Sequence, residues 1–220
     1  MTGLVAAVRL DVLTVRPYAR QLLLVVAAVA WIALMSGPPT AVVASGSVFA
    51  ALVAAYPFAI GDKHDLDTLR AVLPVARGTH VRARYAGSLA LYVVALAVCV
   101  ALALGTSVAR HTPPALGELG TVVAVGYALY ALLVGLQLPV YYALGYTRGR
   151  MVAYLPLVVL SAAVAGSAAV LGDRAPDLDA WLTTRPASLV PALLVGGTAL
   201  LVLSCAVSLR LDARRAAQQR

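Results

Sequence analysis

Residue types that commonly perform chemistry are few in this 220-residue sequence, and their spacing builds no catalytic site. Ser45-Gly46-Ser47 has the small residues of a nucleophile motif, yet it lies in an apolar run without a histidine to act as its base. The three histidines stand apart, and no HExxH or paired-carboxylate arrangement occurs. The only lysine, Lys63, follows Asp62 rather than a glycine, so there is no Walker A loop. We therefore expect no enzyme activity, no metal site and no cofactor in this chain.

The long apolar runs contain no aspartate, glutamate, lysine, arginine or histidine. Ion-coupled carriers and proton relays usually keep at least one such group at membrane depth. An ion-driven pump is therefore disfavoured, and the energy for any transport must come from elsewhere. Cys99 and Cys205 lie in these runs, so we expect them to pack as small residues rather than to form a disulfide or a zinc site.

The most informative pattern lies between residues 62 and 84. Three leucines recur at helical spacing and form one apolar stripe, Asp65 can cap the start of such a helix, and Pro74 ends it. A two-turn helix over 65–73 is too short to be stable alone in water. It should lie against a partner protein or in the lipid interface, and periodicity alone leaves both open. The residues of this candidate docking site are Asp65, Leu66, Leu69, Arg70, Leu73, Pro74 and Arg77.

A second candidate site is the face shared by Tyr127, Tyr130, Gln137 and Tyr141, which fall within about 80° of one another on a helix. Gln137 is costly against lipid, so this face should meet protein or a cavity. It can be the wall of a substrate path or a helix contact made of hydrogen bonds and aromatic rings. The second interpretation is favoured.

Composition defines the elements that carry these residues. The chain is 62% hydrophobic and 12% charged, whereas soluble domains are about 45–50% apolar and about 25% charged. This predicts an all-α membrane protein, because a spanning helix needs about 20 apolar residues. Six runs qualify, over residues 21–36, 40–61, 86–109, 119–144, 151–171 and 188–209.

Basic residues predict the orientation of these spans. Of the 17 lysines and arginines, fourteen fall in segments on one side and three on the other. The positive-inside rule then places both termini in the cytoplasm, with 210–220 as a basic tail. The charge favours anionic lipids, and it is too dispersed for nucleic-acid binding. The Ala/Val/Arg-rich composition is typical of a prokaryote, so we expect a multi-pass protein of the prokaryotic plasma membrane.

The first twenty residues form a separate element. Leu4, Val8 and Val12 share one side of a helix, while Arg9 and Arg16 lie on another. This pattern predicts an amphipathic helix on the cytoplasmic leaflet.

The segment between the second and third spans resembles the cytoplasmic loop of ABC-2 type transporter permeases, particularly small six-span bacterial exporters of peptides and antibiotics. Asp62-Lys63-His64-Asp65 stands where the family typically shows Glu-Lys-Asn/Asp-Gly, and Ala76 stands where it often has Ser. The resemblance rests on Tyr56-Pro57-Phe58, Asp62-Lys63, Leu66-Asp67-Thr68-Leu69, Leu73-Pro74-Val75, Arg77 and Val81-Arg82-Ala83-Arg84-Tyr85.

The resemblance implies a permease that pairs with a second copy or a related permease and with two cytoplasmic ABC ATPase subunits, which hold the ATP and magnesium. Residues 65–73 become the coupling helix, seated in a cleft of the ATPase, and the N-terminal helix also touches the ATPase. Residues 172–191, with Trp181, become short helices dipping into the outer leaflet or an ordinary loop. The cargo is expected to be an amphipathic peptide, a lipid or a drug-like molecule.

Two other functions stay open at this point. A substrate-capture subunit of a vitamin importer also has about six spans, but it would retain a small ligand without nucleotide. A membrane enzyme such as a lipid transferase is the weakest alternative, because the cytoplasmic loops lack an acidic metal-binding cluster.

Overall fold

The computed structural model describes residues 2–15, 17, 20, 24, 27–28, 31, 39–64, 66, 76–109, 111, 116–171 and 188–218. Within these ranges the chain is helical and has no strand. The helices are α1 (Thr2–Val15), α3 (Pro39–Val53), α4 (Tyr56–Lys63), α6 (Arg77–Ala109), α7 (Leu116–Leu144), α8 (Tyr146–Leu171) and α10 (Leu189–Gln218).

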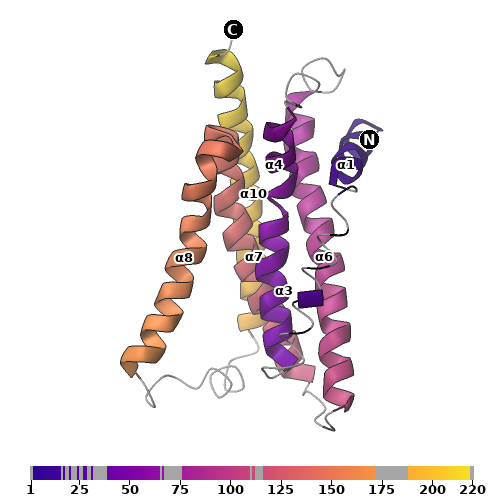
Figure 1. The fold of residues 1–220 in the computed structure, drawn as a ribbon, viewed down its shortest axis with the longest axis vertical. Helices are drawn as coiled ribbons and strands as arrows, with labels where there is room; N and C mark the ends of the chain where they lie inside the picture. The colour runs from indigo at the N-terminus through magenta and orange to yellow at the C-terminus, as the bar shows by residue number, and fades with distance from the viewer. Residues whose placement is uncertain are drawn as a thin grey trace.

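The long helices form a bundle in which α7 is central (Figure 1). Helix α7 packs against α10, α3 and α8, while α3 and α10 also contact α6. Helix α8 leans away from the others as it runs from α7 (Figure 1). Four described segments are long and apolar enough to cross a membrane, namely Val42–Lys63, Arg77–Val108, Leu119–Leu144 and Leu189–Arg215.

These segments agree with four of the six predicted spans, and the remaining two stay predictions. The predicted span 151–171 lies within α8. The predicted span 21–36 lies outside the described residues except at Leu24, Ala27, Ala28 and Trp31, and so does nearly all of the predicted outer segment 172–191.

The second predicted span is not one continuous helix. Residues 40–61 divide into α3 and α4, with turn residues at Ala54 and Ala55. The physical reason is Pro57, in the first turn of α4, because proline has no N–H to donate to the carbonyl one helical turn earlier. This proline is a signal in the sequence from which the break could have been predicted.

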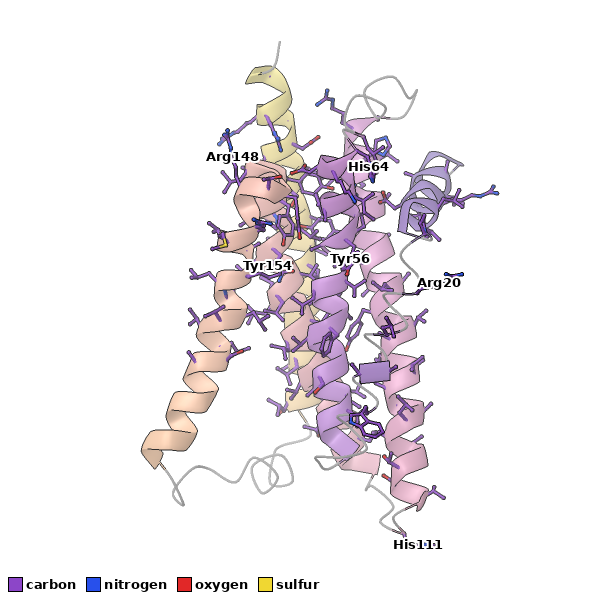
Figure 2. All side chains as sticks on the ribbon, in the orientation of Figure 1. Arg20, Tyr56, His64, His111, Arg148 and Tyr154 are labelled. Atoms are coloured by element: carbon purple, nitrogen blue, oxygen red, sulfur yellow. The ribbon has the colours of Figure 1, made fainter. Side chains whose placement is uncertain are left out.

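One end of the bundle gathers the segments that the sequence assigns to the cytoplasm. Helix α4 ends there, α6 begins, α7 meets α8, and α10 ends, with both termini nearby (Figure 1). His64 and Arg148 lie near this end and His111 lies at the other (Figure 2). We call it the basic end. Two helices extend further here than predicted: α6 starts at Arg77 rather than at residue 86, and α10 continues through the basic tail to Gln218.

Candidate functional site

The candidate docking site joins two helices at the basic end. The chain leaves α4 at Lys63 and enters α6 at Arg77. Leu66 is helical and half-buried, and Arg77 is exposed as the first residue of α6. The other members, Asp65, Leu69, Arg70, Leu73 and Pro74, lie outside the described residues. The structure thus describes two of the seven members, of which Arg77 lies in α6.

At the basic end lies a group of side chains from four helices, which we call the arginine cluster: Asp11, Phe58, Arg84, Tyr141 and Tyr142. The Nε atom of Arg84 lies 3.2 Å from Oδ2 of Asp11, and its Cζ atom lies 4.2 Å from the centroid of the Phe58 ring. Phe58 also contacts the rings of Tyr141 and Tyr142, with centroids 5.2 Å and 5.1 Å away. The cluster thus joins α1, α4, α6 and α7.

Arg84 is one of the basic residues from which the orientation was predicted, and the structure shows that its side chain is buried. A buried guanidinium needs a nearby anion, and its flat face can also rest on an aromatic ring. Asp11 and Phe58 supply these two partners. The charge of Arg84 still lies at the basic end, so its burial changes its local role and not the predicted orientation.

The same ion pair fastens α1 to the bundle. Ala7 is buried and Asp11 half-buried, whereas Val5, Val12 and Leu13 are exposed together with Arg9. Helix α1 packs on α6 and, to a smaller extent, on α4. The side that meets protein is therefore the one bearing Ala7 and Asp11. The side of α1 that was expected to be apolar is only partly covered, because Val8 is half-buried and Val12 is exposed.

A second contact at the basic end connects α4 to α8. Oδ2 of Asp62 accepts hydrogen bonds from the backbone N–H and the hydroxyl of Thr147, both at 2.9 Å. Thr147 lies in the first turn of α8, so the carboxylate satisfies one of the free N–H groups at that helix start. We call this contact the Asp62 cap.

The corner between α7 and α8 is a single residue, Gly145, with a φ of +77°. Its N–H donates to the Tyr141 carbonyl at 2.9 Å, and its own carbonyl accepts from Gly149 N–H at 3.0 Å. Glycine adopts this left-handed conformation without the steric cost of a side chain. A Cβ at Gly145 would lie 3.3 Å from Nη2 of Arg215, so α10 also reaches this corner. Beside it, partial burial raises the pKa of the Tyr146 hydroxyl to about 12.

The face of α7 that carries Tyr127, Tyr130, Gln137 and Tyr141, which we call the tyrosine face, points into the bundle. Tyr130, Gln137 and Tyr141 are each at most 1% exposed. The Tyr130 hydroxyl donates to Ser88 Oγ at 3.1 Å, and its ring stacks on Tyr92 with centroids 4.2 Å apart. These contacts are those of a helix interface. Two polar groups of this face, Nε2 of Gln137 and the hydroxyl of Tyr141, have no hydrogen-bond partner among the described residues.

Further hydroxyl contacts, which the sequence did not indicate, hold α6 and α7 to α10. The Tyr85 hydroxyl lies 2.6 Å from Ser204 Oγ and 2.8 Å from Ser208 Oγ. Ser204 Oγ donates in turn to the Gly135 carbonyl at 2.7 Å. Further toward the start of α10, the Tyr127 hydroxyl lies 3.0 Å from Thr198 Oγ1. Hydroxyl groups therefore contribute to binding these helices together.

Sequence reasoning did not single out Asp11, Asp62, Arg84 or Thr147 as site residues. One signal was available for Asp11, which is the only acidic residue before Asp62 and stands in a helix otherwise suited to a negative leaflet. Its partner is 73 positions away, since 84 − 11 = 73. No local pattern indicates such a pairing.

A family model described as "ABC-2 family transporter protein" matches residues 8–211, from within α1 to near the end of α10. No curated protein and no solved structure matches the chain.

Proposed function

Because this chain belongs to the ABC-2 family of transporter membrane proteins, we propose that it is a permease subunit driven by ATP hydrolysed on separate cytoplasmic ABC ATPase subunits. Members of the family are membrane components of transport systems and are not themselves enzymes. The observation that carries the proposal is the family match over nearly the whole chain, together with apolar helices long enough to span a membrane.

The ATPase would bind at the coupling segment 65–73. Leu66, Leu69 and Leu73 would fill an apolar cleft, and Arg70 and Arg77 would meet acidic groups at its rim. The fold supports this proposal because the flanking helices α4 and α6 both reach the basic end, where the arginine cluster joins them. A hinge motion of the ATPase pair would then move α4 and α6 together.

Export is proposed for an amphipathic peptide, a lipid or a drug-like molecule, using a second permease subunit to complete the path. The support is chemical, since the predicted spans are apolar and aromatic and contain no aspartate, glutamate, lysine, arginine or histidine. In the tyrosine face, Tyr127, Tyr130 and Tyr141 serve mainly as helix contacts. Gln137 is the member of that face with an amide free to meet a polar group, so it is the proposed substrate-path position.

The test of this proposal is co-purification with the ABC ATPase that is proposed as its partner. Leu69→Asp should abolish association, because a carboxylate in an apolar cleft is strongly disfavoured. Ala213→Asp is the matched control, since it adds the same charge at an exposed position on the basic end of α10. The control should keep association, and both variants should remain in the membrane fraction.

Unchanged ATPase association of Leu69→Asp would count against the coupling segment as the docking site. Loss of association in both variants would show a general effect of added negative charge instead of a docking contact.

A further inference from the structure

Helix α8 is fastened mainly at its basic end. Among the described helices it contacts chiefly α7 and α4, and it leans away from the bundle beyond that end (Figure 1). Its outer surface is open, with Met151 77%, Leu155 58% and Val159 58% exposed. A long helix held at one end can change its angle with little loss of packing, because few buried apolar contacts oppose the motion.

The fastened end contains a corner that permits such a change. Gly145 alone separates α7 from α8. Glycine can adopt φ values slightly above or below the observed +77° without a steric cost. Arg148 marks the first turn of α8 beside this corner (Figure 2). A single-residue corner specifies where α8 starts, but it does not by itself specify the direction in which α8 runs.

The Asp62 cap supplies that direction. Two hydrogen bonds of 2.9 Å end on one carboxylate oxygen, one from the backbone and one from the side chain of Thr147. Hydrogen bonds to an ionised acceptor are stronger than neutral ones, and a carboxylate also interacts favourably with the positive end of a helix dipole. Because both donors belong to one residue, the pair restricts the rotation of the first turn of α8 relative to α4.

Asp62 is also close in sequence to the coupling segment. It lies in the last turn of α4, three positions before residue 65. Any displacement of the coupling segment therefore reaches Asp62 before it reaches the rest of α4.

We propose that Asp62 is a positioning residue that sets the angle of α8 and transmits the displacement of the coupling segment to it. This inference rests on the proposed function for the source of the displacement, whereas the fixing of α8 by Asp62 does not depend on an ATPase. The requirement at position 62 is an acceptor oxygen at the correct distance. Asp62→Asn should therefore retain the contact through its amide oxygen, and Asp62→Ala should lose it.

The first experiment measures the angle of α8 in the permease alone. Spin labels are attached at Ala163→Cys on α8 and Val195→Cys on α10, both exposed, with Cys99 and Cys205 replaced by serine. Electron–electron distances are recorded in lipid nanodiscs, with labelled protein diluted in unlabelled protein. Asp62→Ala should broaden the distance distribution, Asp62→Asn should restore the narrow one, and Lys63→Ala should leave it unchanged as the neighbouring exposed control.

An unchanged distribution in Asp62→Ala would overturn the inference, and so would an Asp62→Asn distribution as broad as that of Asp62→Ala. Thr147→Ser adds an independent check, because it keeps both donors and should behave as the unmodified chain does.

The second experiment uses the complex with the ATPase in vesicles of phosphatidylethanolamine and phosphatidylglycerol. Trapping with ATP and vanadate should shift the 163–195 distance, and Asp62→Ala should lose this shift while ATPase association and ATP hydrolysis persist. A shift that survives in Asp62→Ala, or no shift in the unmodified complex, would overturn transmission through Asp62. Failure of the proposed function is distinguishable, because it removes ATPase association itself and leaves the result in nanodiscs intact.

Discussion

Arg84 shows how a single charged side chain can organise one end of a membrane bundle. It approaches Asp11 on one side and the Phe58 ring on another, and it is buried while it does so. Desolvating a guanidinium is expensive, so its net contribution depends on its partners being present. Asp11 and Asp62 both lie at the basic end, but their roles differ. Asp11 compensates the buried charge of Arg84, whereas Asp62 accepts a hydrogen bond from a free backbone N–H at the start of α8.

At this scale we predict that Asp11→Ala destabilises the permease by on the order of 3 kcal/mol, because it removes the anion beside a buried cation. Asp11→Asn should cost less, since the amide can still accept a hydrogen bond. Unfolding can be followed in detergent by the reaction of the buried Cys99 thiol with a fluorescent maleimide, in a Cys205→Ser background.

The matched control is Arg9→Ala, which removes an exposed charge from the same helix. It should leave the unfolding temperature nearly unchanged. Equal destabilisation by Asp11→Ala and Arg9→Ala would mean that the ion pair with Arg84 is not what holds α1 to the bundle.

At the scale of helices, close approach and hydroxyl contacts hold the bundle together. Lipid is as apolar as the helix surfaces, so association in a membrane depends on van der Waals packing and interhelical hydrogen bonds. Helices α7 and α10 meet in this way: Gly197 faces Tyr127 and Ala131, and Ser204 bonds to the Gly135 carbonyl.

Adjacent glycines on α10 provide a test of that contact. A Cβ at Gly197 would lie 2.9 Å from Cε1 of Tyr127, whereas a Cβ at Gly196 would meet nothing within 4 Å. Gly197→Val should therefore destabilise the permease by about 1–3 kcal/mol through overpacking. Gly196→Val should stay within about 0.5 kcal/mol, as expected for an exposed position.

The same maleimide assay measures both variants. A loss of stability in Gly196→Val as large as that in Gly197→Val would show that contact with α7 does not decide the result.

The limits of individual helices follow partly from local sequence. The predicted span 119–144 corresponds closely to α7, because Glu118 and Gly145 bound its uncharged run. The start of α6 could not be found in the same way. Arg77, Arg82 and Arg84 suggested a loop, but a helix can carry arginines beyond the membrane, and Arg84 is compensated by a residue on another helix.

At the scale of the whole molecule, membrane insertion and the family were predictable, whereas the contacts at the basic end were not. Low charge and long apolar runs suffice to predict membrane insertion, since such a chain must bury its apolar surface in the lipid bilayer. The Asp62 cap and the arginine cluster join residues far apart in sequence, and no periodic pattern carries that information. The tyrosine face lies between these cases, because periodicity placed its residues on one side and only the fold supplied Ser88 and Tyr92 as their partners.

The orientation of the molecule is the remaining whole-molecule prediction. Positive charge resists transfer across the membrane, so the basic end should face the cytoplasm. His64→Cys and Arg148→Cys lie near that end and His111→Cys near the other (Figure 2). In a background without Cys99 and Cys205, a membrane-impermeant maleimide added to intact cells should label position 111 alone. Positions 64 and 148 should react only after permeabilisation, since all three are exposed and differ in side rather than in burial. Labelling of 64 or 148 in intact cells would reverse the orientation and remove the coupling segment from the reach of any cytoplasmic ATPase.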